Sequence, residues 1–178
     1  YTGTGVKFYW TKYDKLGVEI EADPVTHRKV FQWDDRNDIE KQLEASGKDR
    51  TPRAKFWFSG EYTAPQYPVR YVGILKYPYF YCTNIENKQE QTKPNDAAEL
   101  GKYGDCGTGT AYQQADGNYT FMIDHKASYI TFLPYTSQKG VARAKIEKIK
   151  VTADKAVCGQ FDFNENGIDL SSRPATTR

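Results

Sequence analysis

Histidine is the residue type best suited to proton transfer near neutral pH, and the chain has two, His27 and His125. His27 lies in a short Pro-Val-Thr-His-Arg segment, whereas His125 follows Asp124 in a stretch of alternating apolar residues. A catalytic histidine needs a nucleophile or a carboxylate close to it in space, and Asp124 does not meet this need because adjacent strand residues point to opposite faces. Nucleophile motifs such as Gly-x-Ser-x-Gly are also absent. We therefore predict a structural hydrogen-bonding role for His125, no catalytic residue and no enzyme activity.

Two further segments imitate ligand-binding loops. Residues 162–169 place oxygen-bearing side chains at alternate positions and Gly at the sixth, as the start of a calcium loop does. The twelfth position, where a bidentate Glu belongs, is Arg173, so a turn at Asn166-Gly167 is the simpler explanation. The glycines of Gly101–Thr110 have no following helix and no Lys in the spacing of a phosphate-binding loop. We therefore predict neither a cofactor nor a metal ion.

The three cysteines, Cys82, Cys106 and Cys158, are too few and too scattered for a disulfide framework, and the absence of a Cys-x-x-Cys pair disfavours zinc. Cys82 and Cys106 could pair across a loop, but the sequence favours buried thiols.

The composition favours β-structure and excludes some partners. Aromatic residues make up 15 % of the 178 residues, with 14 Tyr and 9 Phe. The 25 Lys and Arg nearly balance the 23 Asp and Glu, so the net charge of +2 gives no argument for nucleic acid or acidic lipid. No apolar run reaches the roughly 18 residues of a transmembrane helix. Because the chain opens at Tyr1 with no Met and no signal peptide, we expect a processed or trimmed fragment.

Alternation of apolar and polar residues, the pattern of a half-buried strand, dominates the chain. It is clearest from Tyr119 to Leu133, which we predict to be two central strands separated by a bend, bulge or change of sheet at Asp124–Lys126. Further strands are predicted at Val6–Trp10, Lys15–Ile20, Lys29–Trp33, Ala54–Phe58, Arg70–Leu75, Tyr77–Tyr81, Ala144–Ala153 and Val157–Phe163.

The remaining segments complete an all-β domain with one short helix. The helix is predicted over Asp34–Ser46, with Asp35 or Asn37 as N-cap and Gly47 just beyond its end. Pro68 and Pro78 limit their strands to sheet edges or strand ends. The polar segment 83–116 is predicted to be a long loop across the sheet, and Ser137–Gly140 a turn. Residues 1–170 form the predicted domain, and 171–178 a polar tail or the start of a linker.

Several blocks in consistent order, spanning nearly the whole chain, resemble the fimbrillin-like (type V pilin) proteins of Bacteroides and related gut anaerobes. Each block is mostly strand pattern, so the ordered set carries the resemblance. The blocks are the opening TGTGVKFYWTKYDKLGV, Gly104-Asp105-Cys106-Gly107, FMIDHKASYITFLPYTS from Phe121, Lys145–Val151 and the strand that contains Gly159.

The resemblance implies a transthyretin-like Greek-key β-sandwich that is the N-terminal domain of a two-domain surface lipoprotein. Members are exposed on the outer membrane of Gram-negative anaerobes through an upstream lipid anchor, and they assemble into fimbriae used in adhesion. Proteolysis after an Arg removes the first strand of a subunit, and a terminal strand of the next subunit fills the groove. Tyr1 fits a chain that begins after such a removed strand.

The resemblance therefore predicts a structural subunit or adhesin of a bacterial fimbrium. Its partners would be other fimbrial subunits, through strand exchange, and surface glycans or proteins of a host or of other bacteria, but not nucleic acid. An alternative is a surface lipoprotein that does not polymerise and binds glycans by stacking on Tyr77, Tyr79 and Tyr81. A hydrolase is a third class, for which the sequence offers no constellation of residues.

Overall fold

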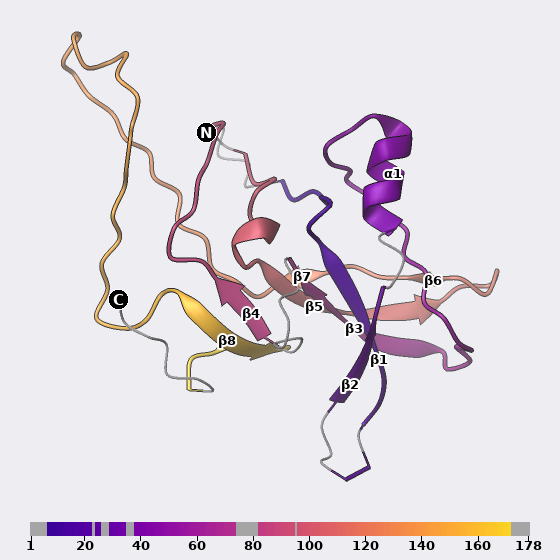
Figure 1. Ribbon diagram of the computed structural model, residues 1–178. Coiled ribbons are helices and arrows are strands. Elements are labelled where there is room, and N and C mark those ends of the chain that lie inside the picture. Colours follow the sequence, from indigo (N-terminus) through magenta and orange to yellow (C-terminus); the bar gives the residue numbers. More distant parts are fainter. Residues whose placement is uncertain are drawn as a thin grey trace.

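The computed structural model describes residues 7–22, 24–25, 29–34, 38–73, 82–94 and 96–171. Its described strands form two antiparallel sheets (Figure 1), which confirms the predicted all-β sandwich. The larger sheet has the order β2-β1-β3-β5, and both β6 and β7 pair with β5. Its strands are β1 (Lys15–Ala22), β2 (Lys29–Trp33), β3 (Gln66–Val72), β5 (Cys106–Gln113), β6 (Tyr119–Thr120) and β7 (Asp124–His125).

The smaller sheet has the order β4-β8-β9. Its strands are β4 (Cys82–Ile85), β8 (Gly159–Asn164) and β9 (Gly167–Asp169). A single described α-helix, α1 (Asp38–Ser46), confirms the predicted short helix, and Gly47 has the positive φ of 63° that suits the position after a helix end. The predicted caps Asp35 and Asn37 lie outside the described residues. A 3-10 helix, η1 (Gly101–Tyr103), precedes β5.

The core has two parts because β3 sends alternate side chains to opposite faces of the larger sheet. Val69 and Tyr71 join Leu16, Val18 and Ala111 on one face, which aromatic side chains from the connecting segments cover. On the other face, Val72 and Cys106 pack against Phe163 of the smaller sheet. Arg70 lies between the sheets, with its guanidinium 4.1 Å from the centre of the Phe163 ring.

The predicted strand at Ala54–Phe58 is wrong, because side chains of α1 take the place of a partner strand. The amide side chain of Gln42 donates to the Lys55 carbonyl at 2.7 Å and accepts from the Lys55 N–H at 2.9 Å. The Asp38 carboxylate accepts from the Trp57 N–H at 3.0 Å. The alternating side chains still pack as expected, since Phe56 and Phe58 contact the core. The predicted strand at Val6–Trp10 is also not formed over its described residues, where Trp10 makes only an isolated bridge to Thr51.

The predicted long loop over residues 83–116 is wrong, because this segment contains β4 and the central strand β5. Its glycines are required by close packing: a Cβ at Gly107 would lie 2.4 Å from Ile123, and one at Gly109 would lie 2.2 Å from the Met122 carbonyl. The prediction that Pro68 lies at a sheet edge or near a strand end holds only for the strand end, because Pro68 is the third residue of β3. β3 is central, but Pro68 lies just beyond the last residue that pairs with β1, so its missing N–H leaves no gap in that ladder.

The stretch Tyr119–Leu133 forms its first predicted strand but not its second. β6 and β7 pair with β5 in one register, and Tyr119, Phe121 and Ile123 pack on the core as the alternation predicts. The ladder is interrupted at 121–123 and not at the predicted Asp124–Lys126 step, where Asp124 and His125 are paired. After Lys126, whose N–H donates to the Cys106 carbonyl, the chain leaves the sheet.

The predicted strand at Ala144–Ala153 is not formed either. β8 begins at Gly159, inside the predicted Val157–Phe163 strand, and the predicted turn at Ser137–Gly140 is present.

Candidate functional site

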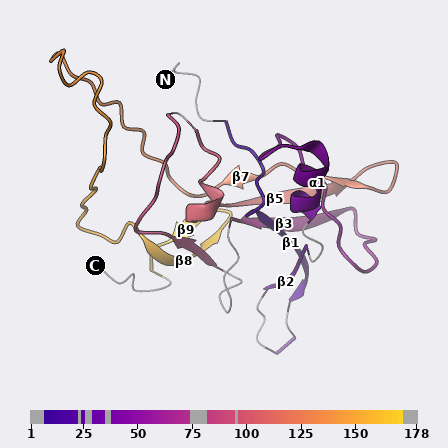
Figure 2. The same ribbon diagram turned by 45° about the horizontal axis from the view of Figure 1, so that its top comes forward.

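Residues 127–158, which we call the arm, run out from the two sheets and return to β8. Figures 1 and 2 show this segment, coloured orange, projecting away from the sheets in both views. Every residue from 128 to 155 is exposed. The exposed side chains include large apolar ones, among them Ile130, Phe132, Leu133, Tyr135, Ile146, Ile149 and Val151. An exposed apolar surface of this kind is larger than single scattered apolar side chains, which makes the arm the candidate site of this chain.

The backbone of the arm makes few of the hydrogen bonds that its sequence pattern suggests. Its backbone–backbone bonds to described residues are confined to the turn at the tip, where the N–H groups of Val141 and Ala142 donate to the Gln138 carbonyl. Residues 144–153 belong to no strand, although Ile149, Val151 and Ala153 alternate with Lys148, Lys150 and Thr152. The arm therefore carries strand-patterned sequence that forms no ladder with the described part of the chain.

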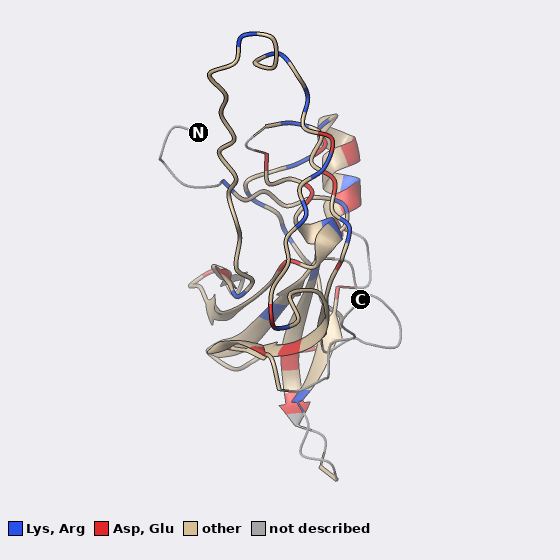
Figure 3. Ribbon diagram, turned by 90° about the vertical axis from the view of Figure 1, so that its left-hand side faces the viewer, with Lys and Arg blue, Asp and Glu red and all other residues tan. Residues whose placement is uncertain are grey.

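The arm is also the basic part of the chain. It carries Lys139, Arg143, Lys145, Lys148, Lys150 and Lys155 against Glu147 and Asp154, a formal net charge of +4. Because the whole chain has a net charge of +2, the remaining residues have a net charge of −2. Figure 3 shows Lys and Arg, in blue, at the tip of the arm and along the limb that returns to β8, whereas the outgoing limb, residues 127–138, carries neither.

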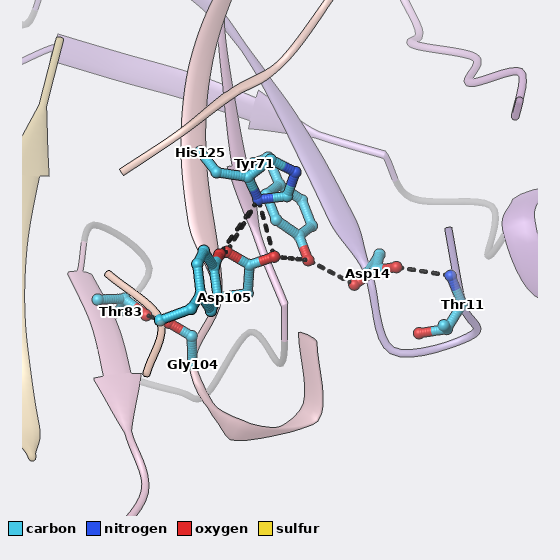
Figure 4. Close-up of polar contacts among 8 residues, drawn as sticks. Thr11, Asp14, Tyr71, Thr83, Gly104, Asp105 and His125 are labelled. Carbon is cyan, nitrogen blue, oxygen red and sulfur yellow. Dashed lines mark hydrogen bonds and ion pairs between the residues drawn. The ribbon is translucent and has the colours of Figure 1, made fainter. Parts of the chain in front are cut away.

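A polar cluster fixes the base of the arm to the larger sheet (Figure 4). Asp105, only 4 % exposed, precedes β5, and its carboxylate contacts His125 Nδ1 at 2.9 Å and 3.0 Å. The hydroxyl of Tyr129, the third residue of the arm, donates to the same carboxylate. The His125 ring stacks on Phe8 with a centroid distance of 3.8 Å. The cluster thus joins the start of the arm, the end of β7 and the N-terminal segment.

The cluster continues to a second buried carboxylate, that of Asp14, which precedes β1. Asp14 is 3 % exposed and accepts from the Thr11 N–H at 2.6 Å and from the Tyr71 hydroxyl at 2.8 Å. The Tyr71 hydroxyl also lies 3.4 Å from Asp105. Burial raises the pKa of Asp14 to about 6, because it disfavours the charged form more than the hydrogen bonds favour it. Burial and the two carboxylates raise the pKa of Tyr71 and keep its hydroxyl protonated.

The geometry gives His125 the hydrogen-bonded position that the sequence analysis predicted, with Asp105 and not Asp124 as its partner. Asp124 instead pairs with Lys126 at 2.5 Å. The described hydrogen-bond partners of His125, Asp105 and Tyr129, can orient the imidazole and hold it against the sheet. Chemically, this arrangement can hold the N-terminal segment, the end of β7 and the start of the arm together through hydrogen bonds and ring stacking.

Sequence reasoning missed Asp14, Tyr71 and Asp105. One signal in the sequence is glycine: a Cβ at Gly101 would lie 2.2 Å from Asp14 Oδ1, and a Cβ at Gly73 would lie 1.8 Å from the Gly101 carbonyl. Glycine at both positions lets η1 pack directly against the cluster.

Other residues singled out from the sequence lie elsewhere. Tyr77, Tyr79, Tyr81 and His27 lie outside the described residues, so the predicted glycan-stacking surface stays a prediction. The calcium-like segment 162–169 forms the β8–β9 hairpin, with its turn at Glu165–Asn166, one residue earlier than the turn predicted at Asn166-Gly167. Within the described ranges, no group of three or more His, Cys, Asp or Glu is placed to hold a metal ion.

The cysteines form no disulfide, and Cys82 and Cys106 are buried, which confirms the prediction of buried thiols. Burial raises the pKa of Cys106 to about 12. A shallow hollow lies beside the Arg50–Asp96 ion pair of 2.5 Å, and these two of its lining residues are bonded to each other.

Among the described residues, no helix has the length and apolar character needed to cross a lipid bilayer. Comparison with protein families, with curated proteins and with solved structures found no match to this chain.

Proposed function

We propose that the protein is a structural subunit or adhesin of a bacterial fimbrium and assembles by strand complementation between subunits. The observation that carries this proposal is the arm: strand-patterned apolar sequence that is exposed and has no ladder partner among the described residues. Pairing with a strand of a neighbouring subunit satisfies the backbone groups of such a segment and covers its apolar side chains at the same time.

The free energy of this pairing includes the burial of apolar side chains that are exposed on the arm. Full burial of a Val or Ile side chain contributes about 1.5–3 kcal/mol. Ile149 and Val151 are 47 % and 45 % exposed, so completing their burial contributes about 1 kcal/mol each. Several side chains of this kind along one strand, together with backbone hydrogen bonds of about 0.5–1.5 kcal/mol each, would all contribute to the stability of a contact between subunits.

The finer parts of the proposal follow from the resemblance to fimbrillin-like proteins. The sandwich would have transthyretin-like Greek-key topology, and the mature protein would be a lipoprotein held at the outer membrane by an upstream anchor. Adhesion would use surface glycans or proteins as partners. The clustered contacts of Asp105, His125 and Tyr129 suit a non-catalytic role, because they hold the base of the arm in place while its outer part pairs with a neighbour.

The test is the assembly state of the purified chain. Sedimentation velocity over a wide range of concentrations should give an open-ended series of oligomers, and electron microscopy should show linear polymers. A single closed species at every concentration would contradict the proposal. If that species also bound a glycan array, and lost binding when Tyr77, Tyr79 and Tyr81 were replaced by Ala, the glycan-binding alternative would replace it.

A further inference from the structure

Within residues 144–153, positions 148–153 combine strand alternation with positive charge, whereas Ile146 is out of phase with the apolar face of Ile149 and Val151. Ile149, Val151 and Ala153 share one face, and Lys148, Lys150 and Thr152 share the other. A segment of this type fits a sheet edge that is apolar on one face and acidic on the other.

The smaller sheet of this fold presents such an edge. Of its described strands, β9 stands at the edge, paired with β8 only. Ile168 packs toward the core, and Leu170, two residues further on, is 62 % exposed. Residues 159–171 carry Asp162, Glu165 and Asp169 and no Lys or Arg, a formal charge of −3. The opposite edge, β4, is partly covered, since the Glu86 N–H donates to the Tyr103 carbonyl and the Thr83 hydroxyl to the Gly104 carbonyl.

Chain connectivity favours a second copy as the source of the strand. Only residues 154–158 separate the segment from β8, so a tight return would run it antiparallel to β8. The two edge strands of the smaller sheet, β4 and β9, also run antiparallel to β8. Within one chain, the segment would therefore run parallel to whichever edge strand it joined, although the rest of the sheet is antiparallel. A segment from another copy can approach β9 in the antiparallel direction, which is the more stable pairing per residue.

We propose that residues 144–153 are the donated strand and that they pair with the β9 edge of a second copy of this chain. Ile149 and Val151 then lie beside Ile168 and Leu170, and Lys148 and Lys150 lie beside the acidic side chains of the β8–β9 hairpin. Because donor and acceptor are different surfaces, the contact repeats from copy to copy and gives a linear assembly. The inference rests on the proposed function and adds the identity of both strands.

A pair of matched substitutions tests the donor. Val151 and Val141 are 45 % and 46 % exposed, and Val141 lies in the tip turn outside the donated strand. Val151→Asp should weaken assembly by roughly tenfold or more, since a loss of about 1.4 kcal/mol is tenfold in affinity and an unpaired carboxylate on the apolar face costs at least that. Val141→Asp should leave assembly unchanged. Thermal unfolding of the dilute chain should be the same for both variants, because both side chains are exposed.

Zero-length carbodiimide coupling tests the acceptor without depending on the register of pairing. A mixture of ¹⁵N-labelled and unlabelled protein is assembled and coupled, and the linked peptides are identified by mass. Mixed-isotope links should join Lys145, Lys148 or Lys150 to an acid of residues 159–171. Links only within one isotope would show that the arm closes on its own chain, and links to other surfaces would show another acceptor; either result overturns the inference.

The outcomes separate the two proposals. If the wild-type chain assembles but Val151→Asp assembles as well as Val141→Asp, the inference fails and the proposed function stands. If the wild-type chain never assembles, both fail.

Discussion

Asp14 should make the stability of the protein depend on pH in a direction opposite to that of most carboxylates. Its carboxyl is 3 % exposed, and burial raises its pKa from the ordinary value of 3.8 to about 6. The folded state therefore binds this proton more tightly than the unfolded state does. The stabilising contribution is fully present below about pH 4 and is lost as the pH rises through about 6.

The magnitude follows from the difference between the two pKa values. The pKa of Asp14 is about two units higher in the folded state, and each unit corresponds to about 1.4 kcal/mol. Asp14 should therefore make the protein about 3 kcal/mol less stable above pH 7 than below pH 4. Asp14→Asn removes the titrating group and should remove that part of the pH dependence. Tyr71→Phe should steepen the dependence, because the Tyr71 hydroxyl donates to Asp14 at 2.8 Å and favours its charged form.

The assay is urea unfolding followed by tryptophan fluorescence at about pH 4, about pH 5 and about pH 8. Wild type should lose more stability between the lowest and highest pH than Asp14→Asn does, by about 2–3 kcal/mol. A constant offset from the lost carboxylate does not affect this comparison of slopes. Parallel pH profiles for wild type and Asp14→Asn would refute the reasoning, because they would show that Asp14 titrates alike in the folded and unfolded states.

Two further predictions concern packing. Gly73→Ala should destabilise the fold by about 2 kcal/mol or more in thermal unfolding, because the added Cβ would lie 1.8 Å from the Gly101 carbonyl. Gly140→Ala, in open space at the arm tip, is the control and should be nearly neutral. Equal effects of the two substitutions would contradict the close packing of η1. Gln42→Ala should lower the free energy of urea unfolding by about 1–2 kcal/mol, because two hydrogen bonds to the Lys55 backbone are lost. Glu44→Ala, at an exposed position of the same helix, is the control and should cost about 0.5 kcal/mol or less. Similar costs for the two variants would count against helix side chains as the hydrogen-bond partners of residues 54–58.

The elements that the sequence predicted well are those whose own residues determine them. β2 has the predicted bounds, β1 begins where predicted, and α1 ends where predicted because Gly47 supplies the positive φ. The error at Ala54–Phe58 has a different origin: its alternation is genuine, but the hydrogen-bond partners are side chains of a helix 13 to 19 residues away in sequence. A local pattern does not contain that information.

The central strand β5 was missed because its glycines lower its apolar content. Gly107 and Gly109 are required by the close approach of residues 122–124, which only the tertiary structure reveals. The buried cluster was missed for a similar reason. Asp14 and Asp105 are two of 23 acidic residues, and the close approach of Gly101 to Asp14 is recognised only in the tertiary structure.

The arm is the part of the chain in which the sequence pattern and the structure differ most. Residues 127–133 and 144–153 have the alternation of core strands, yet they form no ladder with the described residues of the chain. A strand pattern shows that a segment is suited to pairing, and for residues 144–153 we propose that the partner belongs to a neighbouring copy.

Amide hydrogen exchange of residues 144–153, measured by mass spectrometry before and after assembly, tests strand donation by the arm most directly. In the dilute monomer these amides should exchange rapidly, because they form no backbone ladder with the described residues, whereas the amides of β3 and β5 should be protected. In the assembled protein the amides of residues 144–153 should become protected. Slow exchange of these amides in the monomer, or unchanged rapid exchange in the assembled state, would contradict strand donation.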